Sequence, residues 1–212
     1  MTTDEVLALY DSIRETITAR IAFFKELWRN STENDIFTEL AFCLLTPQSK
    51  AKSADKAIRE LLAKDLLFSD NAEAIADVLN IVRFKNHKAR YIIEARHQFS
   101  TENGIEIKKY INENEIINTR NYFFKNVKGI GLKEASHFLR NIGFGEHLAI
   151  LDRHILKNLK NCGVIDEVPQ SLPPKVYFAI EDKLLSFANS IGIPPDHLDF
   201  VFWYKEAGEV FK

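Results

Sequence analysis

The stretch "NVKGIGLKEASHFLRNIG", residues 126–143, places two glycines around a single isoleucine, between two segments of helical period. Gly129 and Gly131 permit a tight turn, because glycine tolerates left-handed backbone and close approach of neighbouring atoms. Apolar residues next to the glycines anchor such a turn on both sides. The pattern therefore predicts a helix-hairpin-helix motif over about 115–142, whose second helix starts near Leu132.

A hairpin of this kind can hold a phosphate group without reading a base. The N–H groups at the start of the second helix point outward and attract an anion. Lys125 and Lys128 lie beside the turn and add positive charge. We expect Lys125, Lys128, Gly129 and Gly131 to contact the backbone of DNA. The alternative is an ordinary packing joint between two helices.

Lys133 follows the second glycine by two positions and falls in the first turn of the expected helix. The helix dipole disfavours a positive charge there, so a lysine at this place is unusual. A neutral amine beside a phosphate-binding turn could attack C1′ of a sugar and form a Schiff base. The alternative is a lysine that is simply exposed to solvent.

Asp152 lies 19 positions after Lys133, in "LAILDRHIL", residues 148–156. A carboxylate directly after apolar residues and before a new helix is typical of an N-cap. Such a carboxylate could also deprotonate Lys133 and stabilise a developing oxocarbenium ion. The two functions are compatible, and the sequence leaves both open.

Positive charge is concentrated in the middle of the chain. The 212 residues have a net charge of −2, yet residues 81–160 carry 15 Lys and Arg against 8 Asp and Glu. Within that region "RFKNHKARY", residues 83–91, alternates aromatic and basic side chains. This combination favours binding to a phosphate backbone and to unstacked bases, although an ordinary solvated basic surface would look similar.

Several classes of protein are disfavoured by composition. The apolar runs are shorter than the roughly 20 residues of a membrane span, and the start of the chain lacks the pattern of a signal peptide. Cys43 and Cys162 are too few for a four-cysteine zinc site or an all-cysteine iron–sulfur cluster. The six histidines show no ligand spacing. We expect a cytoplasmic protein, nucleoid-associated when on DNA, with reduced cysteines, no catalytic metal and no cofactor.

Helical periodicity runs through nearly the whole chain, and no segment has a convincing strand pattern. The fold class is predicted to be all-α, with residues 1–212 forming one unit of two closely packed helical lobes. We expect a break between the first two helices at "NSTEND", residues 30–35, and prolines at the starts of the last two. The expected helices span 3–29, 35–45, about 50–64, 72–82, 86–100, 105–113, 115–126, 132–142, 152–161, 174–190 and 195–207.

The glycine hairpin, Lys133 and Asp152 together resemble the helix-hairpin-helix DNA glycosylases, a superfamily that includes endonuclease III and the 8-oxoguanine glycosylases. The resemblance implies a two-lobed helical fold with the active site in the cleft between the lobes. It implies that Lys133 is the nucleophile of a bifunctional glycosylase and β-lyase, with Asp152 as its partner. Endonuclease III relatives usually carry a four-cysteine cluster, which this chain cannot build.

Further segments are similar to the compact archaeal and bacterial branch of 8-oxoguanine DNA glycosylases and AP lyases. These are "FCLLTPQSKAKSADKAI", "VRFKNHKARYI" and "HLDFVFWYKEAGEVFK", so the similarity covers most of the chain. By position, it implies a base pocket that flips out and recognises the damaged base in double-stranded DNA. Its expected residues are Phe84, Asp199, Trp203, Lys212 and Gln48.

Plain alternatives exist for these residues and for the function. Phe84 and Trp203 could be core aromatics, Asp199 a solvated helix residue, and Lys212 a frayed terminus. The resemblance implies a DNA repair enzyme, expected to act as a monomer, that excises 8-oxoguanine and cuts the strand by β-elimination. A bifunctional glycosylase for oxidised pyrimidines and a non-enzymatic hairpin DNA-binding protein remain as alternatives.

Overall fold

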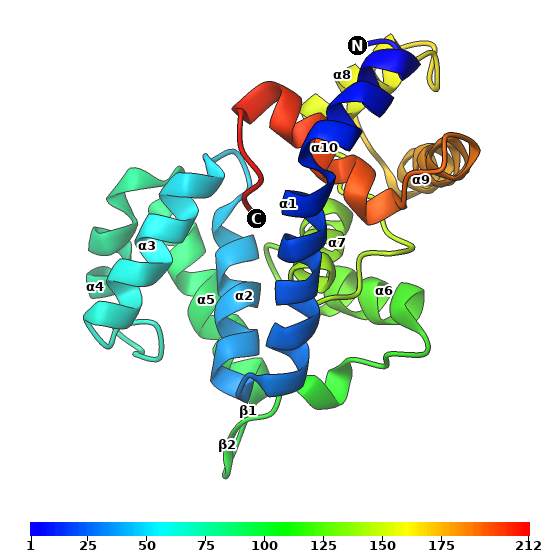
Figure 1. Cartoon of the computed structure of the whole chain (residues 1–212). Coiled ribbons are helices and arrows are strands. Elements are labelled where there is room, and N and C mark those ends of the chain that lie inside the picture. The colour runs from blue at the N-terminus through cyan, green and yellow to red at the C-terminus, as the bar shows by residue number, and fades with distance from the viewer. The chain divides into compact units, whose positions relative to one another are not determined.

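A computed structural model describes residues 1–212 of the chain (Figure 1). It contains ten α-helices, two short 3₁₀ helices and one small antiparallel sheet, which confirms the all-α prediction. The chain divides into two compact units: unit 1 is Met1–Glu26 with Leu139–Lys212, and unit 2 is Leu27–Phe138. Both boundaries fall inside helices, namely α1 (Thr3–Asn30) and α7 (Leu132–Asn141). No helix combines the length and the apolar character that crossing a bilayer would need.

Unit 2 is built around α2, the most apolar of its helices. Nine of the thirteen residues of α2 are buried, and α3 and α5 pack against it. In Figure 1, α3, α4 and α5 form a group on one side of α2. The helices of this unit, besides the parts of α1 and α7, are α2 (Glu33–Leu45), α3 (Ala51–Ala63), α4 (Ala72–Val78), α5 (Lys85–Phe99) and α6 (Ile116–Asn126), with 3₁₀ helices η1 (Leu79–Ile81) and η2 (Lys108–Tyr110).

The break between α1 and α2 lies where the sequence predicted it. Thr32 is the N-cap of α2, and its hydroxyl accepts a hydrogen bond from the N–H of Asp35. The Asp35 carboxylate accepts in return from the N–H of Thr32 at 2.9 Å. This reciprocal pair is a capping box, which satisfies two N–H groups that the helix itself leaves without partners.

The prediction was wrong over residues 105–113. A strand pair, β1 (Ser100–Thr101) and β2 (Gly104–Ile105), replaces the start of the expected helix, and only η2 is helical after it. Gly104 has a φ of +109°, a backbone conformation that turns the chain back on itself and interrupts a helix. The apolar residues at 105, 107 and 111 therefore lie in a strand, a loop and the end of a single 3₁₀ turn, and not on one face of a helix.

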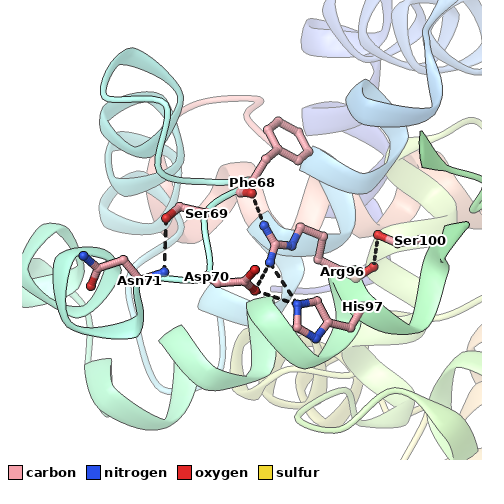
Figure 2. A network of polar contacts seen from close by, with 7 residues as sticks. All are labelled: Phe68, Ser69, Asp70, Asn71, Arg96, His97 and Ser100. Carbon is pink, nitrogen blue, oxygen red and sulfur yellow. Dashed lines mark hydrogen bonds and ion pairs between the residues drawn. The ribbon is translucent and has the colours of Figure 1, made fainter. Parts of the chain in front are cut away.

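A buried arginine fastens the end of α5 to the loop before α4 (Figure 2). The guanidinium of Arg96 donates to the carbonyl oxygen of Phe68 and to the carboxylate of Asp70. His97 also bonds that carboxylate, at 2.6 Å, and this contact is the main cause that lowers the pKa of Asp70. The side chain of Arg96 is 9% exposed, whereas that of its partner Asp70 is 70% exposed. The loop is thus held by two neighbouring side chains of α5, Arg96 and His97.

Unit 1 places α8 (Arg153–Asn161) and α9 (Pro174–Ser190) against α10 (Pro195–Ala207). The predicted prolines occupy the first turns of α9 and α10, where the missing N–H has no helical partner to lose. Glu181 of α9 is buried and accepts a hydrogen bond from the N–H of Ala149 at 2.9 Å. The hydroxyl group of Tyr177 donates a hydrogen bond to the carbonyl oxygen of Ala149. These two bonds fix the segment that leads into α8.

Replacing Arg96 with Leu should lower the free energy of unfolding by about 1–3 kcal/mol, because the carbonyl of Phe68 loses its buried donor. Urea unfolding followed by circular dichroism measures this change. The control is Lys64→Ala, which removes an exposed ion pair with Glu60 in α3 and should change stability by less than about 0.5 kcal/mol. Equal stability of the Arg96 variant and the wild type would show that the Arg96 network does not stabilise the fold.

Candidate active site

The two glycines of the hairpin meet different structural demands. Gly129 has a φ of +91°, and a Cβ at this position would overlap the ring of Tyr91. Gly131 does not have a positive φ, but a Cβ there would lie 2.8 Å from Oε2 of Glu134. The apolar residues that flank the glycines, Val127 and Ile130, are both buried. The turn is therefore defined by lack of space as much as by backbone conformation.

Lys133 lies in the first turn of α7, as predicted, and its side chain is 24% exposed. Its Nζ lies 3.0 Å from Oε1 of Glu134. The other carboxylate oxygen of Glu134 accepts a hydrogen bond from the N–H of Gly131 at 3.2 Å. Sequence reasoning missed Glu134, although a glutamate at the third helical position is the known partner of an N-cap N–H. The lysine amine is consequently held by a carboxylate of its own helix turn.

The predicted backbone-binding lysines are exposed at the end of α6 and in the turn. Lys128 lies 3.2 Å from the carboxylate of Glu94, and its Nζ is 5.6 Å from the centre of the Tyr91 ring. Tyr91 therefore contacts the hairpin twice, under Gly129 and beside Lys128. Lys125 is on the last turn of α6, one helical turn before the glycines. The structure thus places cations next to N–H groups at the start of α7, as phosphate binding requires.

Gln48 and Phe84 are the two predicted pocket residues in unit 2, and both have left-handed backbone, with φ of 53° and 59°. Positive φ costs energy in residues other than glycine and persists only where neighbours hold it. Phe84 is 52% exposed, so the core-aromatic alternative is wrong for it. The guanidinium of Arg83 lies 5.4 Å from its ring centre.

A buried lysine links these two turns. Nζ of Lys88 donates to the carbonyl oxygens of Leu45 and Pro47, each at 2.8 Å, and to Oγ of Ser49 at 2.9 Å. Ser49 Oγ also accepts from the N–H of Arg83, the residue before Phe84. Lys88 is 3% exposed, and burial lowers its pKa to about 8. Lys88 thereby fixes the turn of Gln48 and the start of α5.

Lys88 lies inside the "RFKNHKARY" segment that indicated DNA binding, but nothing in the sequence marks it as buried. Its three donors are all used within the protein, which matches the full capacity of an ammonium group. Lys88 therefore stabilises the conformation of residues 45–49, and its amine has no donor left for DNA. Arg83 is an exposed cation of this segment, and it lies against the ring of Phe84.

In unit 1, Asp152 is the N-cap of α8, as predicted. Its Oδ1 accepts hydrogen bonds from the N–H groups of His154 and Ile155, both at 2.8 Å. Both bonds use one oxygen, so Oδ2 is not needed for the cap. The ring of His154 makes an edge contact with Trp203, with ring centres 5.6 Å apart. His154, which the sequence analysis did not select, joins the cap to the predicted pocket.

Asp199 and Trp203 share a face of α10, as their spacing predicted. Asp199 is only 9% exposed and lies 3.3 Å from the guanidinium of Arg140, so the solvated alternative is wrong. The same guanidinium lies 4.3 Å from the ring centre of Phe200. Nε1 of Trp203 is buried and has no hydrogen-bond partner. An unpaired buried donor of this kind is costly and is typical of a surface completed by a ligand.

The predicted residues fall into two groups. Unit 2 holds Lys125, Lys128, Gly129, Gly131, Lys133, Gln48 and Phe84; unit 1 holds Asp152, Asp199, Trp203 and Lys212. Lys212 is half-buried at the C-terminus. Within unit 2, Glu134 links Gly131 to Lys133, and within unit 1, His154 links Asp152 to Trp203. No three His, Cys, Asp or Glu side chains converge as a metal ion would require.

Known proteins resemble this chain over almost its entire length. Residues 17–193 match a family model described as 8-oxoguanine DNA glycosylase. An 8-oxoguanine DNA glycosylase/AP lyase from Fusobacterium nucleatum is 46% identical over 210 residues, covering 99% of this chain and 97% of that protein. The crystal structure of the 8-oxoguanine DNA glycosylase of Thermotoga maritima superposes with a TM-score of 0.87 and 32% identity, covering 99% and 98% of the two chains.

A second solved structure contains nucleic acid. It is the 8-oxoguanine glycosylase/lyase of Methanocaldococcus jannaschii in complex with a 15mer DNA that contains 8-oxoguanine. It matches with a TM-score of 0.85 and 31% identity, covering 99% of each chain. The similarity includes all the segments that carry the predicted residues.

The lowered pKa of Lys88 predicts a specific pH dependence of stability. Between pH 8 and the ordinary lysine value of 10.5, the unfolded chain binds more protons at this group than the folded chain, so stability rises with pH. The free energy of unfolding of the wild type, minus that of Lys88→Met, should grow by up to roughly 3 kcal/mol across this range. Urea unfolding at pH 7, 8, 9 and 10 measures it. Other titrating groups are common to both proteins, and a constant difference would contradict the burial of a charged Lys88.

Proposed function

The chain belongs to the 8-oxoguanine DNA glycosylase family, and from this membership we propose that it removes 8-oxoguanine from double-stranded DNA and cuts the strand by β-elimination. The observation that carries this function is the amine of Lys133 at the start of α7, directly after a glycine hairpin with exposed cations. The same hairpin alone would support a non-enzymatic DNA-binding protein. A partly exposed lysine held by a buried carboxylate at that place favours covalent chemistry.

Lys133 acts as the nucleophile. Its neutral amine forms a bond to C1′ of the damaged nucleotide, while the C1′–N9 bond breaks and its electrons leave with the base. The sugar ring opens to a Schiff base between Nζ and C1′. Loss of a proton from C2′ then expels the 3′ phosphate, which cuts the strand. This sequence divides one difficult displacement into several easier steps.

Asp152 stabilises the positive charge that develops on the sugar as the base departs. Its Oδ1 is held by two N–H groups of α8, which fixes the carboxylate before the reaction starts. A charge that is already oriented contributes more than one that must reorient during the reaction. The two capping hydrogen bonds therefore position the carboxylate of Asp152, and its negative charge stabilises the cation on the sugar.

The hairpin holds a phosphate of the damaged strand through Gly129, Gly131 and the N–H groups that follow, assisted by Lys125 and Lys128. These contacts carry no sequence information, since every nucleotide has the same backbone. Gly131 N–H already donates to Glu134, so a phosphate at this end of α7 shares or replaces that carboxylate. A single chain supplies every residue used here, and we expect a monomer that works in the cytoplasm on nucleoid DNA.

The flipped base is recognised by Phe84, Trp203, Asp199, Lys212 and Gln48. The lesion differs from guanine by a hydrogen on N7 and an oxygen on C8, so an added hydrogen-bond acceptor near N7 distinguishes the two. The terminal carboxylate or a backbone carbonyl at Lys212 can supply that acceptor. The aromatic residues supply stacking surfaces, which bind every base with similar strength.

Borohydride reduction tests the nucleophile and the substrate together. The wild type should form a covalent adduct with a duplex that contains one 8-oxoguanine, and Lys133→Gln should form none while still binding DNA. Lys128→Gln serves as the control: it should weaken DNA binding and its salt dependence but keep the adduct at saturating enzyme. An adduct only with a duplex containing an oxidised pyrimidine would instead support the pyrimidine alternative.

Asp152→Asn should slow base release about 100-fold or more at saturating enzyme, since it removes the charge near the developing cation. Asparagine is an equally good N-cap, so the free energy of unfolding should change by less than about 0.5 kcal/mol. Single-turnover kinetics and urea unfolding measure the two effects. An unchanged rate would leave Asp152 with the capping function alone.

A further inference from the structure

Glu134 is the side chain in contact with the amine that the reaction uses. Its Oε1 lies 3.0 Å from Nζ of Lys133, which is hydrogen-bonding distance. Its Oε2 is held by the N–H of Gly131 at 3.2 Å. The residue is 9% exposed, so this carboxylate is largely shielded from water. One carboxylate thus connects the hairpin backbone to the nucleophile.

This contact does not follow from helix geometry alone. Neighbouring residues on a helix point in different directions and do not normally pair. Glu134 reaches both partners because it folds back over the first turn of α7, toward Gly131. A Cβ at residue 131 would lie 2.8 Å from Oε2, so the end of the Glu134 side chain would have to shift. The second glycine of the hairpin therefore provides room for this carboxylate.

Lys88 of α5 and Arg83, just before α5, are electrostatically coupled to the same group of charges as Glu134 and Lys133. The pKa of Lys88 is lowered mainly by burial, raised by the charge of Glu134, and lowered by the charges of Lys133 and Arg83. Glu134 therefore has two lysines within electrostatic range, of which only Lys133 is partly exposed. Lys88 already donates to three acceptors of its own. Lys133 is the lysine whose amine is in direct contact with Glu134.

We propose that Glu134 is a catalytic residue, which takes a proton from the ammonium group of Lys133 and holds the resulting amine for attack. The inference rests on the proposed function, because it gives Glu134 a task only if Lys133 is the nucleophile. It separates the two carboxylates: Glu134 accepts the proton, and Asp152 stabilises the charge on the sugar.

The transfer balances as follows. One proton moves from Nζ of Lys133 to Oε1 of Glu134, which converts the ion pair into a neutral amine and a carboxylic acid. The lone pair on Nζ then forms the bond to C1′, and the electrons of the C1′–N9 bond leave with the base. The base departs as an anion and takes up the proton that the carboxylate had stored. Glu134 is then ionised again, and the new secondary ammonium carries the positive charge.

Glu134→Gln tests this assignment with little change of shape. The amide oxygen of glutamine can still accept the hydrogen bond from Gly131, but the side chain no longer accepts a proton from Lys133. The matched control is Glu94→Gln, which removes the carboxylate paired with Lys128, a hairpin lysine that is not the nucleophile. Single-turnover trapping with borohydride is measured at saturating enzyme from pH 6 to pH 10. Two duplexes are used, one with 8-oxoguanine and one with a preformed abasic site.

We expect Glu134→Gln to form the adduct at least tenfold more slowly than the wild type at pH 7, on both duplexes. The deficit should shrink as pH rises, because hydroxide deprotonates Lys133 when no internal base is present. Glu94→Gln should match the wild-type rate at every pH. The variant's DNA affinity should be equal to or tighter than that of the wild type, since it removes a negative charge near the phosphate.

Other results overturn the assignment. A wild-type rate in Glu134→Gln at all pH values would exclude the proton transfer, and so would a deficit of the same size at every pH, which would reveal positioning alone. A wild type that traps the abasic duplex but not the 8-oxoguanine duplex would refute the proposed substrate, while Glu134 is still judged on the abasic duplex. No adduct of the wild type with either duplex would refute both the proposed function and this inference.

Discussion

The lack of space at two glycines determines how the start of α7 is built. At Gly129 the ring of Tyr91 occupies the volume that a side chain would need, and at Gly131 the carboxylate of Glu134 occupies it. The first contact fastens the turn to α5, and the second brings a charge onto the first turn of α7. Because Lys133 follows directly, its amine is placed by the same packing. A Cβ at Gly129 would require the ring of Tyr91 to move, whereas a Cβ at Gly131 would require a shift of the end of the Glu134 side chain, which contacts Lys133.

Buried cations organise the surroundings of the predicted pocket residues in both units. Lys88 holds the turn of Gln48 and, through Ser49, the start of α5 at Phe84. Arg140 lies against the carboxylate of Asp199. Burying a charge is costly unless hydrogen bonds or an opposite charge compensate it. The groups that compensate Lys88 lie in the turn of Gln48, and the group that compensates Arg140 is Asp199 itself. Each buried cation therefore stabilises the conformation of a segment that carries a predicted pocket residue.

The sequence predicted the helices well, because their signals are local. Helical periodicity, the capping residues at Thr32 and Asp152 and the prolines at the last two helices all act within a few positions. It failed at residues 105–113, where apolar spacing fits a helix but a glycine with positive φ turns the chain. It also gave no hint of the left-handed backbone at Gln48 and Phe84. The turn of Gln48 is bound on both sides by Lys88, which lies about 40 positions further along the chain.

The residues of the candidate site also divide into those predictable from nearby sequence and those that depend on packing. Motif spacing led to the prediction of Lys133 and Asp152, which stays a prediction. Glu134 and Arg140 became visible only through burial and side-chain direction, and these are properties of packing. Glu134 is instructive, since its neighbour in the sequence is the proposed nucleophile and a helix would normally separate the two side chains. The carboxylate folds back to the N–H of Gly131, as a glutamate at the third helical position commonly does. Gly131 leaves space next to the carboxylate that contacts the amine of Lys133. Under the function we propose, the start of α7 uses the same few residues to bind the DNA backbone and to prepare the nucleophile.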